Sequence, residues 1–578
     1  MVTINPNSWL GTTGSAWNVA TNWSCGFIPI SPEEILITTS APHAANLNIA
    51  FTVGAGKTLT ISGSGSLTIA AKATLTIAGT VDFGDKAVVF QSNATGSGSL
   101  GPITGTLTGG TNVTTERYIP ARRAFRFLSP SVTTTTGISA NWQENAGTAT
   151  NLGTHITGAG GPTNGFDPSS TNNPSLFTFT AGAWQAVTNT NTTTLTAGAG
   201  YRLMVRGDRT LSLATNTPTP TTTVLRATGT LKTGNHNAVL NNTAAGFSFV
   251  GNPYQAPVNM KDVINASSNM NTSFMYYWDP TLNSRGGYVT RNLNTDNNDV
   301  TSGFNEFVQP GQAVFVQKDN TATVATLTFT EANKAVGNVS AGMFRTPAST
   351  THSALRLKLM TTLNNTLTEV DGALLLFDNG YSWNFDSNDA IKLGNLDEQV
   401  AIIIDQQQVA IASQSVPNDN DMLAISLANF RQAAYQWHFE LDNYTGPAPF
   451  LHDTVLGTLT QITTATVIPF TVDNRITGSY ENRFQLLFQD TTLSTPSLNN
   501  TITAYPNPAR GGDDLFITNV SPTAIISVRN LLGQQTAVST SPHNNGLVVK
   551  PRSSLSAGIY VVAISDNNNT TVIKWIIN

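Results

Sequence analysis

Charged side chains are scarce in this chain of 578 residues, because Asp, Glu, Lys and Arg together make up only 11% of it, about half the usual globular share. The net charge of −5 offers no basic surface to nucleic acid, so we expect no nucleic-acid partner. No run approaches the roughly 20 consecutive apolar residues of a membrane-spanning helix, which excludes an integral helical membrane protein. A single cysteine, Cys25, excludes a disulfide framework and any zinc site built from several thiolates.

Catalytic motifs are also missing. The seven histidines include no pair at zinc-ligand spacing, and the sequence has neither a nucleophile elbow nor a phosphate-binding loop. We therefore expect no enzyme, no catalytic residue and no metal, and calcium is the one candidate cofactor. Calcium prefers oxygen ligands in loops, although Asp and Asn are also the usual residues of solvated turns, which is the favoured interpretation. The clusters concerned are Asp296–Asp299, Asp386–Asp389 and Asn418–Asp421.

Uncharged polar residues fill the place of the missing charge, mostly Thr, Asn, Ser and Gly. These residues form helices poorly, whereas Thr and Val suit pleated strands. Short alternating apolar runs bounded by Gly, Asn and Pro recur along the chain, which is typical of all-β proteins with many turns. We predict short helices at Val258–Ser267 and Asp389–Leu393. The predicted fold is all-β, with several β-sandwich or solenoid-like domains in tandem.

An internal repeat lies near the N-terminus. The triplets ending at Val53, Ile61, Ile69 and Ile77 share an apolar-Thr-apolar pattern with a step of eight residues. Regular short strands at fixed spacing favour a small β-solenoid or a meander. An antiparallel sandwich with coincidental spacing is an equal alternative, because eight residues is also a normal strand spacing in sandwiches.

Three tryptophans, Trp9, Trp17 and Trp23, precede the repeat. Aromatic rings stack on the apolar faces of sugars, so these residues are candidate glycan contacts. The favoured interpretation is structural: the rings cover the open end of the repetitive sheet, as terminal repeats require.

Changes of pattern divide the chain into five segments. Leu355, Leu357 and Leu359 alternate with polar residues like a half-buried strand, and Ala373–Phe377 is an apolar run typical of a strand buried on both faces. The segments are a Trp-rich start with a short-repeat β domain (1–115), a β-rich domain (116–345), a β-sandwich domain (346–490), a linker (491–500) and a compact C-terminal module (501–578).

Four arginines, Arg117, Arg122, Arg123 and Arg126, lie among aromatic residues at the start of the second segment. A basic strip that binds anions is one interpretation. The favoured alternative is a strand whose arginines pair with nearby carboxylates and stack on rings.

The C-terminal module carries four motifs in order: Tyr505-Pro506-Asn507-Pro508, a middle strand ending in Leu532-Gly533, a Gly558-Ile559-Tyr560 strand and a last strand with Lys574. With them, the module resembles the type A C-terminal sorting domain of the type IX secretion system of Bacteroidota, and the chain resembles a flavobacterial cell-surface cargo protein. The resemblance implies a small Ig-like β-sandwich. Its implied sorting-signal residues are Tyr505, Pro506, Asn507, Pro508, Gly533, Gly558, Tyr560 and Lys574.

The resemblance also implies a route. The chain would pass through the periplasm to the outer surface or the medium, with the translocon, a shuttle protein and a sortase as partners and cleavage within Asp490–Asn500. Met1–Pro6 has no Sec signal, so we expect a mature or truncated form. We expect a secreted or cell-surface structural or adhesive protein that contacts surface glycans or assembles with itself. The alternatives are a carbohydrate-binding surface protein and, less favoured, a secreted hydrolase.

Overall fold

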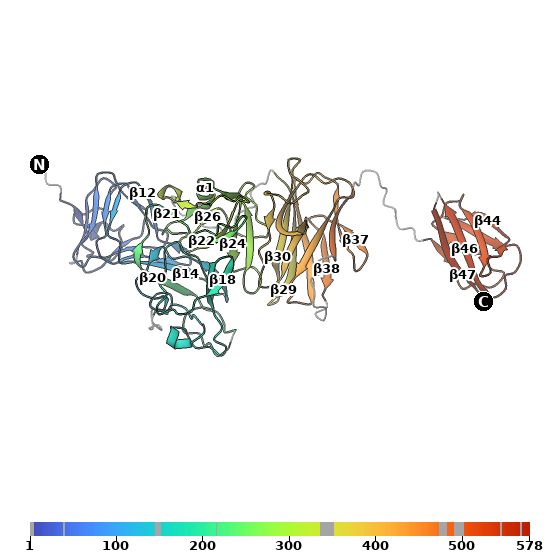
Figure 1. Ribbon diagram of the computed structural model, residues 1–578, viewed down its shortest axis with the longest axis horizontal. Coiled ribbons are helices and arrows are strands. Elements are labelled where there is room, and N and C mark those ends of the chain that lie inside the picture. The colour runs from blue at the N-terminus through green and yellow to red at the C-terminus, as the bar shows by residue number, and fades with distance from the viewer. Residues whose placement is uncertain are drawn as a thin grey trace. The chain divides into compact units, whose positions relative to one another are not determined.

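The computed structural model describes residues 5–38, 41–144, 152–215, 217–335, 352–472, 483–489, 502–543, 546–566 and 569–578. The fold is nearly all β, which confirms the predicted class, and it divides into two compact units, residues 1–489 and 490–578 (Figure 1). Within the described residues, no helix has the length and apolar character needed to cross a membrane.

The first unit begins with a β-solenoid, in which three parallel sheets surround one apolar core. One sheet contains β1 (Asn7–Ser8), β2 (Ile35–Ile37), β5 (Thr58–Ile61), β8 (Thr80–Asp82) and β13 (Thr106–Thr108). The second contains β3 (Ala45–Leu47), β6 (Leu67–Ile69), β9 (Val88–Phe90) and β14 (Val113–Ile119). The third contains β4 (Phe51–Val53), β7 (Thr74–Ile77) and β12 (Ser99–Ile103), and a small hairpin joins β10 (Ser92–Asn93) to β11 (Gly96–Ser97).

Pairing between coils explains the eight-residue step of the repeat. Phe51 pairs with Leu75, so one coil takes 24 residues, three times the step. Each triplet is one side of a three-sided coil, and equivalent sides stack in parallel with their apolar residues facing inward. Leu59 and Leu75 are fully buried accordingly. The solenoid prediction is confirmed here, and the sandwich alternative is wrong for this segment.

The solenoid continues into the middle region through a shared strand. β14 pairs in parallel with β9 of the preceding coil and antiparallel with β20 (Thr223–Leu231) along its whole length. The predicted boundary between residues 115 and 116 therefore falls inside β14, because this one strand belongs to both regions. The predicted boundaries at 345/346, 490/491 and 500/501 lie outside the described residues.

The middle region contains two four-stranded antiparallel sheets. The order in the first is β15 (Ala124–Leu128), β19 (Tyr201–Val205), β17 (Leu176–Thr180) and β18 (Ala183–Ala186). The order in the second is β22 (Phe247–Gly251), β27 (Ala313–Lys318), β24 (Met270–Asp279) and β25 (Gly287–Asn292). Smaller strands are β16 (Val132–Thr133), β21 (His236–Asn237), β23 (Val258–Asn259), β26 (Phe307–Val308) and β28 (Thr328–Phe329).

Helices are few and short. The α-helix α1 (Met260–Asn265) lies within the predicted Val258–Ser267, and the side chain of Asn259 caps it by accepting hydrogen bonds from the backbone N–H groups of Lys261 and Asp262. The described 3-10 turns include η1 (Ala20–Asn22), η2 (Ile138–Ala140), η4 (Gly161–Asn164) and η5 (Glu331–Asn333).

The third region is one eleven-stranded sheet that folds over its own core. Its pairs are antiparallel, as predicted, except that β30 and β33 run parallel. Phe470 on β38 and Phe484 on β39 lie far apart in strand order, yet their ring centroids are 4.9 Å apart. The strands are β29 (Ser353–Leu363), β30 (Thr366–Phe377), β31 (Ala390–Ile391), β32 (Gln399–Ile404), β33 (Gln407–Gln414), β34 (Met422–Ala428), β35 (Ala434–Asp442), β36 (Ala448–Asp453), β37 (Thr458–Gln461), β38 (Val467–Thr471) and β39 (Phe484–Gln489).

The predicted helix at Asp389–Leu393 is wrong. Ala390 and Ile391 form β31, which pairs with β33. The Asp389 carboxylate accepts a hydrogen bond from the backbone N–H of Ser413 at 2.8 Å, which fixes the segment beside the sheet. Sheet pairing thus overrides the weak local preference for a helix.

β30 is buried on both faces, as its apolar run predicts. Leu375 and Phe377 belong to the core of the third region, whereas Leu374 and Leu376 belong to a second core that includes aromatic side chains of the middle region, such as Phe274. The middle and third regions therefore share an apolar interior, which makes them parts of one compact unit.

The second unit is a small β-sandwich, as the resemblance implies. Two four-stranded antiparallel sheets enclose a core in which Trp575 is fully buried. The order of the first sheet is β40 (Thr503–Tyr505), β41 (Leu515–Thr518), β45 (Gly546–Pro551) and β44 (Val538–His543). The order of the second is β43 (Gln535–Thr536), β42 (Ile525–Asn530), β46 (Gly558–Asp566) and β47 (Asn569–Ile577).

Candidate functional site

Asn507 connects the opening motif of the second unit to its last strand. Its side-chain amide donates to the carbonyl oxygen of Lys574 at 2.6 Å, and its side-chain oxygen accepts from the backbone N–H of Ile576 at 2.9 Å. The backbone N–H of Ala509 also donates to the Ile576 carbonyl at 2.8 Å. Sequence motifs nearly 70 positions apart therefore lie side by side, because the Asn507 side chain forms hydrogen bonds with the backbone of β47.

The other residues of the Tyr-Pro-Asn-Pro motif support the same junction. The buried indole N–H of Trp575 donates to the carbonyl of Pro506 at 3.2 Å. Tyr505 is half exposed and stacks on Phe516 of β41, with ring centroids 5.5 Å apart. The peptide bonds before Pro506 and Pro508 are both cis.

The Gly-Ile-Tyr strand lies beside the last strand. Gly558 begins β46 and pairs with Ile577, and Tyr560 pairs with Trp575. Tyr560 is buried, and its hydroxyl donates to the carbonyl of Ser556 at 3.1 Å. Lys574 is exposed, so it is the charged member that this group presents to solvent.

The Leu-Gly motif lies at the turn between β42 and β43. Gly533 has a φ of +79°, in the left-handed region that favours glycine. The turn holds Leu531 and Leu532 in the open, with 68% and 85% of their surfaces exposed. The two leucines thus place apolar side chains next to solvent at this turn.

The tryptophans at the N-terminus do not form a glycan platform, so that prediction is wrong. Trp9, Trp17 and Trp23 are at most 2% exposed and belong to the solenoid core. Trp23 contacts Trp9 and Trp17 edge to face, at centroid distances of 5.0 and 4.6 Å, and Trp17 contacts Phe51 of the first full coil. These rings cover the apolar end of the solenoid. Without them, the core of the first coil would be exposed to water.

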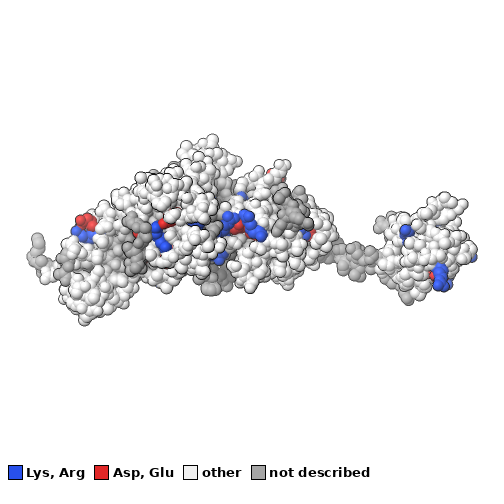
Figure 2. Space-filling model, turned by 90° about the horizontal axis from the view of Figure 1, so that it is seen from below, with Lys and Arg blue, Asp and Glu red and all other residues white. Residues whose placement is uncertain are grey.

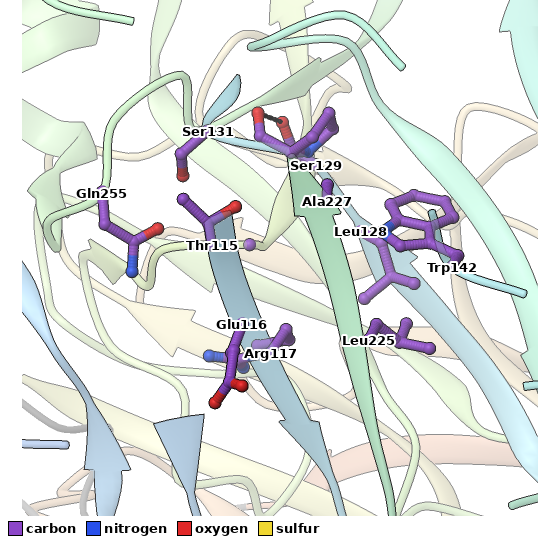
Figure 3. A pocket seen from close by; sticks show the side chains of 12 residues that line it. Thr115, Glu116, Arg117, Leu128, Ser129, Ser131, Trp142, Leu225, Ala227 and Gln255 are labelled. Carbon is purple, nitrogen blue, oxygen red and sulfur yellow. Dashed lines mark hydrogen bonds between the residues drawn. The ribbon is translucent and has the colours of Figure 1, made fainter. Parts of the chain in front are cut away.

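A cavity between β14, β15 and β20 is too small for a substrate (Figure 3). Its free volume of about 20 Å³ has room for about one water molecule, against the several hundred Å³ of a ligand site. Three of its polar side chains also have structural partners. Glu116 pairs with Arg226 at 2.8 Å, Arg117 donates to the carbonyl of Pro310 at 3.1 Å, and Gln255 donates to that of Gly98 at 2.8 Å.

A second cavity, of about 350 Å³, opens in the third region between the β29–β30 turn and strands β35 and β38. Among the residues described around it, the lining is mostly Thr and apolar residues, and Arg483 is the one charged side chain. Arg483 forms a buried ion pair with Asp453 at 2.9 Å. The described part of the lining therefore contains no pair of acids or histidines for general acid–base chemistry.

The first Asp/Asn cluster is part of a buried charge network. Asp299 is fully buried, and burial raises its pKa to about 6. The ammonium of Lys392 lies 3.5 Å from the Asp299 carboxylate and 2.7 Å from that of Asp371. Lys392 and Asp371 were not singled out from the sequence, where the only sign was a charged residue inside an apolar run.

The other two clusters form turns. The backbone N–H of Asp386 donates to the Asp389 carboxylate at 3.0 Å, and that of Asn418 donates to the Asp421 carboxylate at 2.6 Å. In the described part of the chain, no group of three or more Asp, Glu, His or Cys side chains is arranged to hold a metal ion. Calcium binding stays a prediction.

Comparison with known families divides the chain in the same place as the structure. The family described as "Domain of unknown function (DUF8693)" matches residues 8–488, and the one described as "Secretion system C-terminal sorting domain" matches residues 503–578. The second match confirms the sorting-domain resemblance. No curated protein matches. A solved structure described as "Biofilm associated protein - BSP domain" aligns at 10% identity over 80% of this chain and 92% of its own, but its TM-score of 0.12 carries no argument.

Proposed function

Because the chain belongs to the family described as "Domain of unknown function (DUF8693)" and ends in the sorting domain of a type IX secretion cargo, we propose that it is a structural or adhesive protein of the bacterial surface. The sorting domain implies export to the cell surface or the extracellular space and an interaction with the secretion machinery. The proposal adds the role: the first unit works by presenting a surface rather than by catalysis.

The observation that carries this proposal is the continuous interior of the first unit. The solenoid, the middle region and the third region are joined by a shared strand and a shared apolar core, so they form an extended rigid surface rather than lobes around a cleft. Outward-facing positions are mostly uncharged, and Figure 2 shows how little of one face belongs to charged residues. Such a surface suits contact with another polar surface, because few charges need to be desolvated.

Partners in export are assigned by the same proposal. The translocon, a shuttle protein and a sortase would contact the second unit, where Leu531, Leu532 and Lys574 are exposed. The predicted cleavage segment, Asp490–Asn500, lies outside the described residues.

Two experiments in the producing bacterium separate export from role. For export, residues 502–578 are removed, and the protein is measured in periplasm, on whole cells and in medium. We expect it to accumulate in the periplasm, whereas the intact chain is accessible to protease on whole cells or is found in the medium.

For the role, residues 8–488 are removed while the sorting domain is kept behind an unrelated secreted domain. We expect this strain to export the fusion normally and to lose cell–cell or cell–surface attachment measured by retention under flow. Normal attachment without residues 8–488 would contradict the adhesive role. A hydrolytic activity of the purified full chain that survives dialysis against chelator would contradict the absence of catalysis.

A further inference from the structure

Five arginines from separate parts of the first unit gather where the middle and third regions meet, and we call them the arginine cluster. Two precede β15, one follows β19, one lies in the β24–β25 turn and one lies between β34 and β35. They are Arg122, Arg123, Arg206, Arg285 and Arg431.

Strand register brings two of the five together. Ala124 on β15 pairs with Val205 on β19, so the next residues outward, Arg123 and Arg206, lie opposite each other at the end of the ladder. Their charges interact: burial lowers the pKa of Arg206, and the nearby Arg123 lowers it further. The pairing of β15 with β19 therefore holds two like charges opposite each other at the end of these strands.

The β24–β25 turn joins this strand end. The backbone N–H of Phe125 donates to the carbonyl of Arg285 at 3.1 Å. The guanidinium of Arg122 donates to the carbonyls of Thr281 and Asn283, at 2.9 and 2.5 Å. Arg122 is thus oriented by carbonyl oxygens of the turn and not by a carboxylate.

The third region completes the cluster through one shared carboxylate. Asp397 accepts from Arg285 Nε at 3.1 Å and from Arg431 Nε at 3.2 Å. The Arg431 side chain is 54% exposed and that of Arg285 is 32% exposed, so the cluster reaches solvent.

Positive charge exceeds the negative charge that faces it. The carboxylates described beside the cluster include Asp279, Asp397 and Glu398, and Glu398 accepts from the backbone N–H of Arg431 at 3.0 Å. The oxygens of Asp279 already accept hydrogen bonds from Thr281 and from Ser302. Among the described residues, three carboxylates therefore lie beside five guanidinium groups, in a protein with few charges of either sign.

Two buried N–H groups of the cluster lack hydrogen-bond acceptors in the described part of the chain, which also favours a bound anion. Arg122 Nε and Arg206 Nη1 are buried, and neither has a hydrogen-bond acceptor among the described residues. A buried N–H without an acceptor costs free energy, so such groups are usually matched by water or a ligand. An oxyanion would supply the missing acceptors and the missing negative charge together.

We propose that the arginine cluster binds the oxyanion groups, sulfate, phosphate or carboxylate, of an anionic glycan. Guanidinium groups bind such groups through paired N–H donors, and partly exposed arginines from several loops can contact successive groups along a chain. This proposal extends the proposed structural or adhesive function. It depends on that function only in naming a glycan polymer, rather than a free ion, as the ligand. The interpretation favoured from the sequence, a strand whose arginines pair with nearby carboxylates, does not describe Arg117, Arg122 or Arg126, whose guanidinium groups donate to backbone carbonyls.

The test measures binding to the purified full chain by calorimetry. The probes are inorganic sulfate, heparin as a sulfated polysaccharide and polygalacturonate as a carboxylated one. The variant Arg206→Gln/Arg431→Gln removes two charges from the cluster, and Arg510→Gln/Arg552→Gln removes two exposed charges from the second unit as a matched control. Circular dichroism and thermal unfolding check that each variant folds. If the double variant does not fold, Arg431→Gln alone, at an exposed position, replaces it.

We expect a polysaccharide to bind the intact chain and the control variant equally. The cluster variant should bind at least about tenfold more weakly for each charged hydrogen bond lost. Saturable binding of inorganic sulfate that the same variant abolishes would support the site and assign it to a small ion. No binding of any probe, or binding that the cluster variant leaves unchanged, would overturn the proposal. Neither result depends on the attachment assay, so the calorimetry can contradict this site without contradicting the proposed adhesive function, and the reverse.

Discussion

In the solenoid, no charged side chain is among the buried residues described between positions 5 and 111, and its core consists of rows of aliphatic and aromatic residues. The junction of the middle and third regions, by contrast, buries Asp299, Asp371 and Lys392. A row of Leu and Ile needs only the correct spacing, because apolar contacts have no direction. A buried charge needs one particular partner at one distance. The solenoid core can therefore repeat from coil to coil, whereas the charges at the junction require one specific arrangement of partners.

The largest expected effect breaks the junction. Lys392→Met removes the ammonium that contacts both the Asp371 and the Asp299 carboxylate and leaves them buried beside each other, which should cost about 3–5 kcal/mol of stability. The measurement is urea unfolding, with hydrogen exchange at β30 and β32 to locate the loss.

The matched control for this change is Lys72→Met, at an exposed lysine of the solenoid, which should have little effect. Adding Asp299→Asn and Asp371→Asn to Lys392→Met should restore part of the stability. Equal effects of the two lysine variants would mean that the network contributes nothing.

The next effect tests the solenoid. Leu75 lies in a row with Phe51 and Leu100 of the neighbouring coils and is fully buried. Leu75→Ala should cost about 3 kcal/mol through lost contacts and a cavity. Hydrogen exchange should rise in β4, β7 and β12, and the loss should be the same at pH 5 and pH 7 because no ionisable group is involved. A pH-dependent loss would show that the two interiors are less different than the structure indicates.

The smallest effect concerns a buried carboxylate. Burial raises the pKa of Asp389 from 3.8 to about 6, so between these values the folded chain holds a proton that the unfolded chain has released. The ionised group thus destabilises the fold above pH 6, and this cost is lost as the pH falls toward 4.

The comparison variant is Asp389→Asn, which does not titrate. As the pH falls from 7 to 4.5, the unfolding free energy of the native chain relative to this variant should rise by about 2 kcal/mol. Denaturant unfolding at several pH values measures it, and a constant difference would rule out the raised pKa.

Local pattern was enough for the elements that depend on nearest neighbours. The eight-residue triplets, the double-sided burial of Ala373–Phe377 and the short helix near Met260 follow from side-chain alternation and capping. The four sorting motifs identified the second unit for a similar reason, because each motif is contiguous. That Asn507 binds the backbone of β47 was not visible, since the contact joins positions nearly 70 residues apart.

By itself, then, the sequence determined the all-β class and the C-terminal sorting domain. Only the tertiary structure decided that the triplets stack as a solenoid, that Trp9, Trp17 and Trp23 are core residues and that β31 is a strand. It alone also assembled the arginine cluster. The reason is physical: periodicity fixes which face of a strand is apolar, but which strand or charge it meets depends on pairings between distant positions, and those are settled by the whole core.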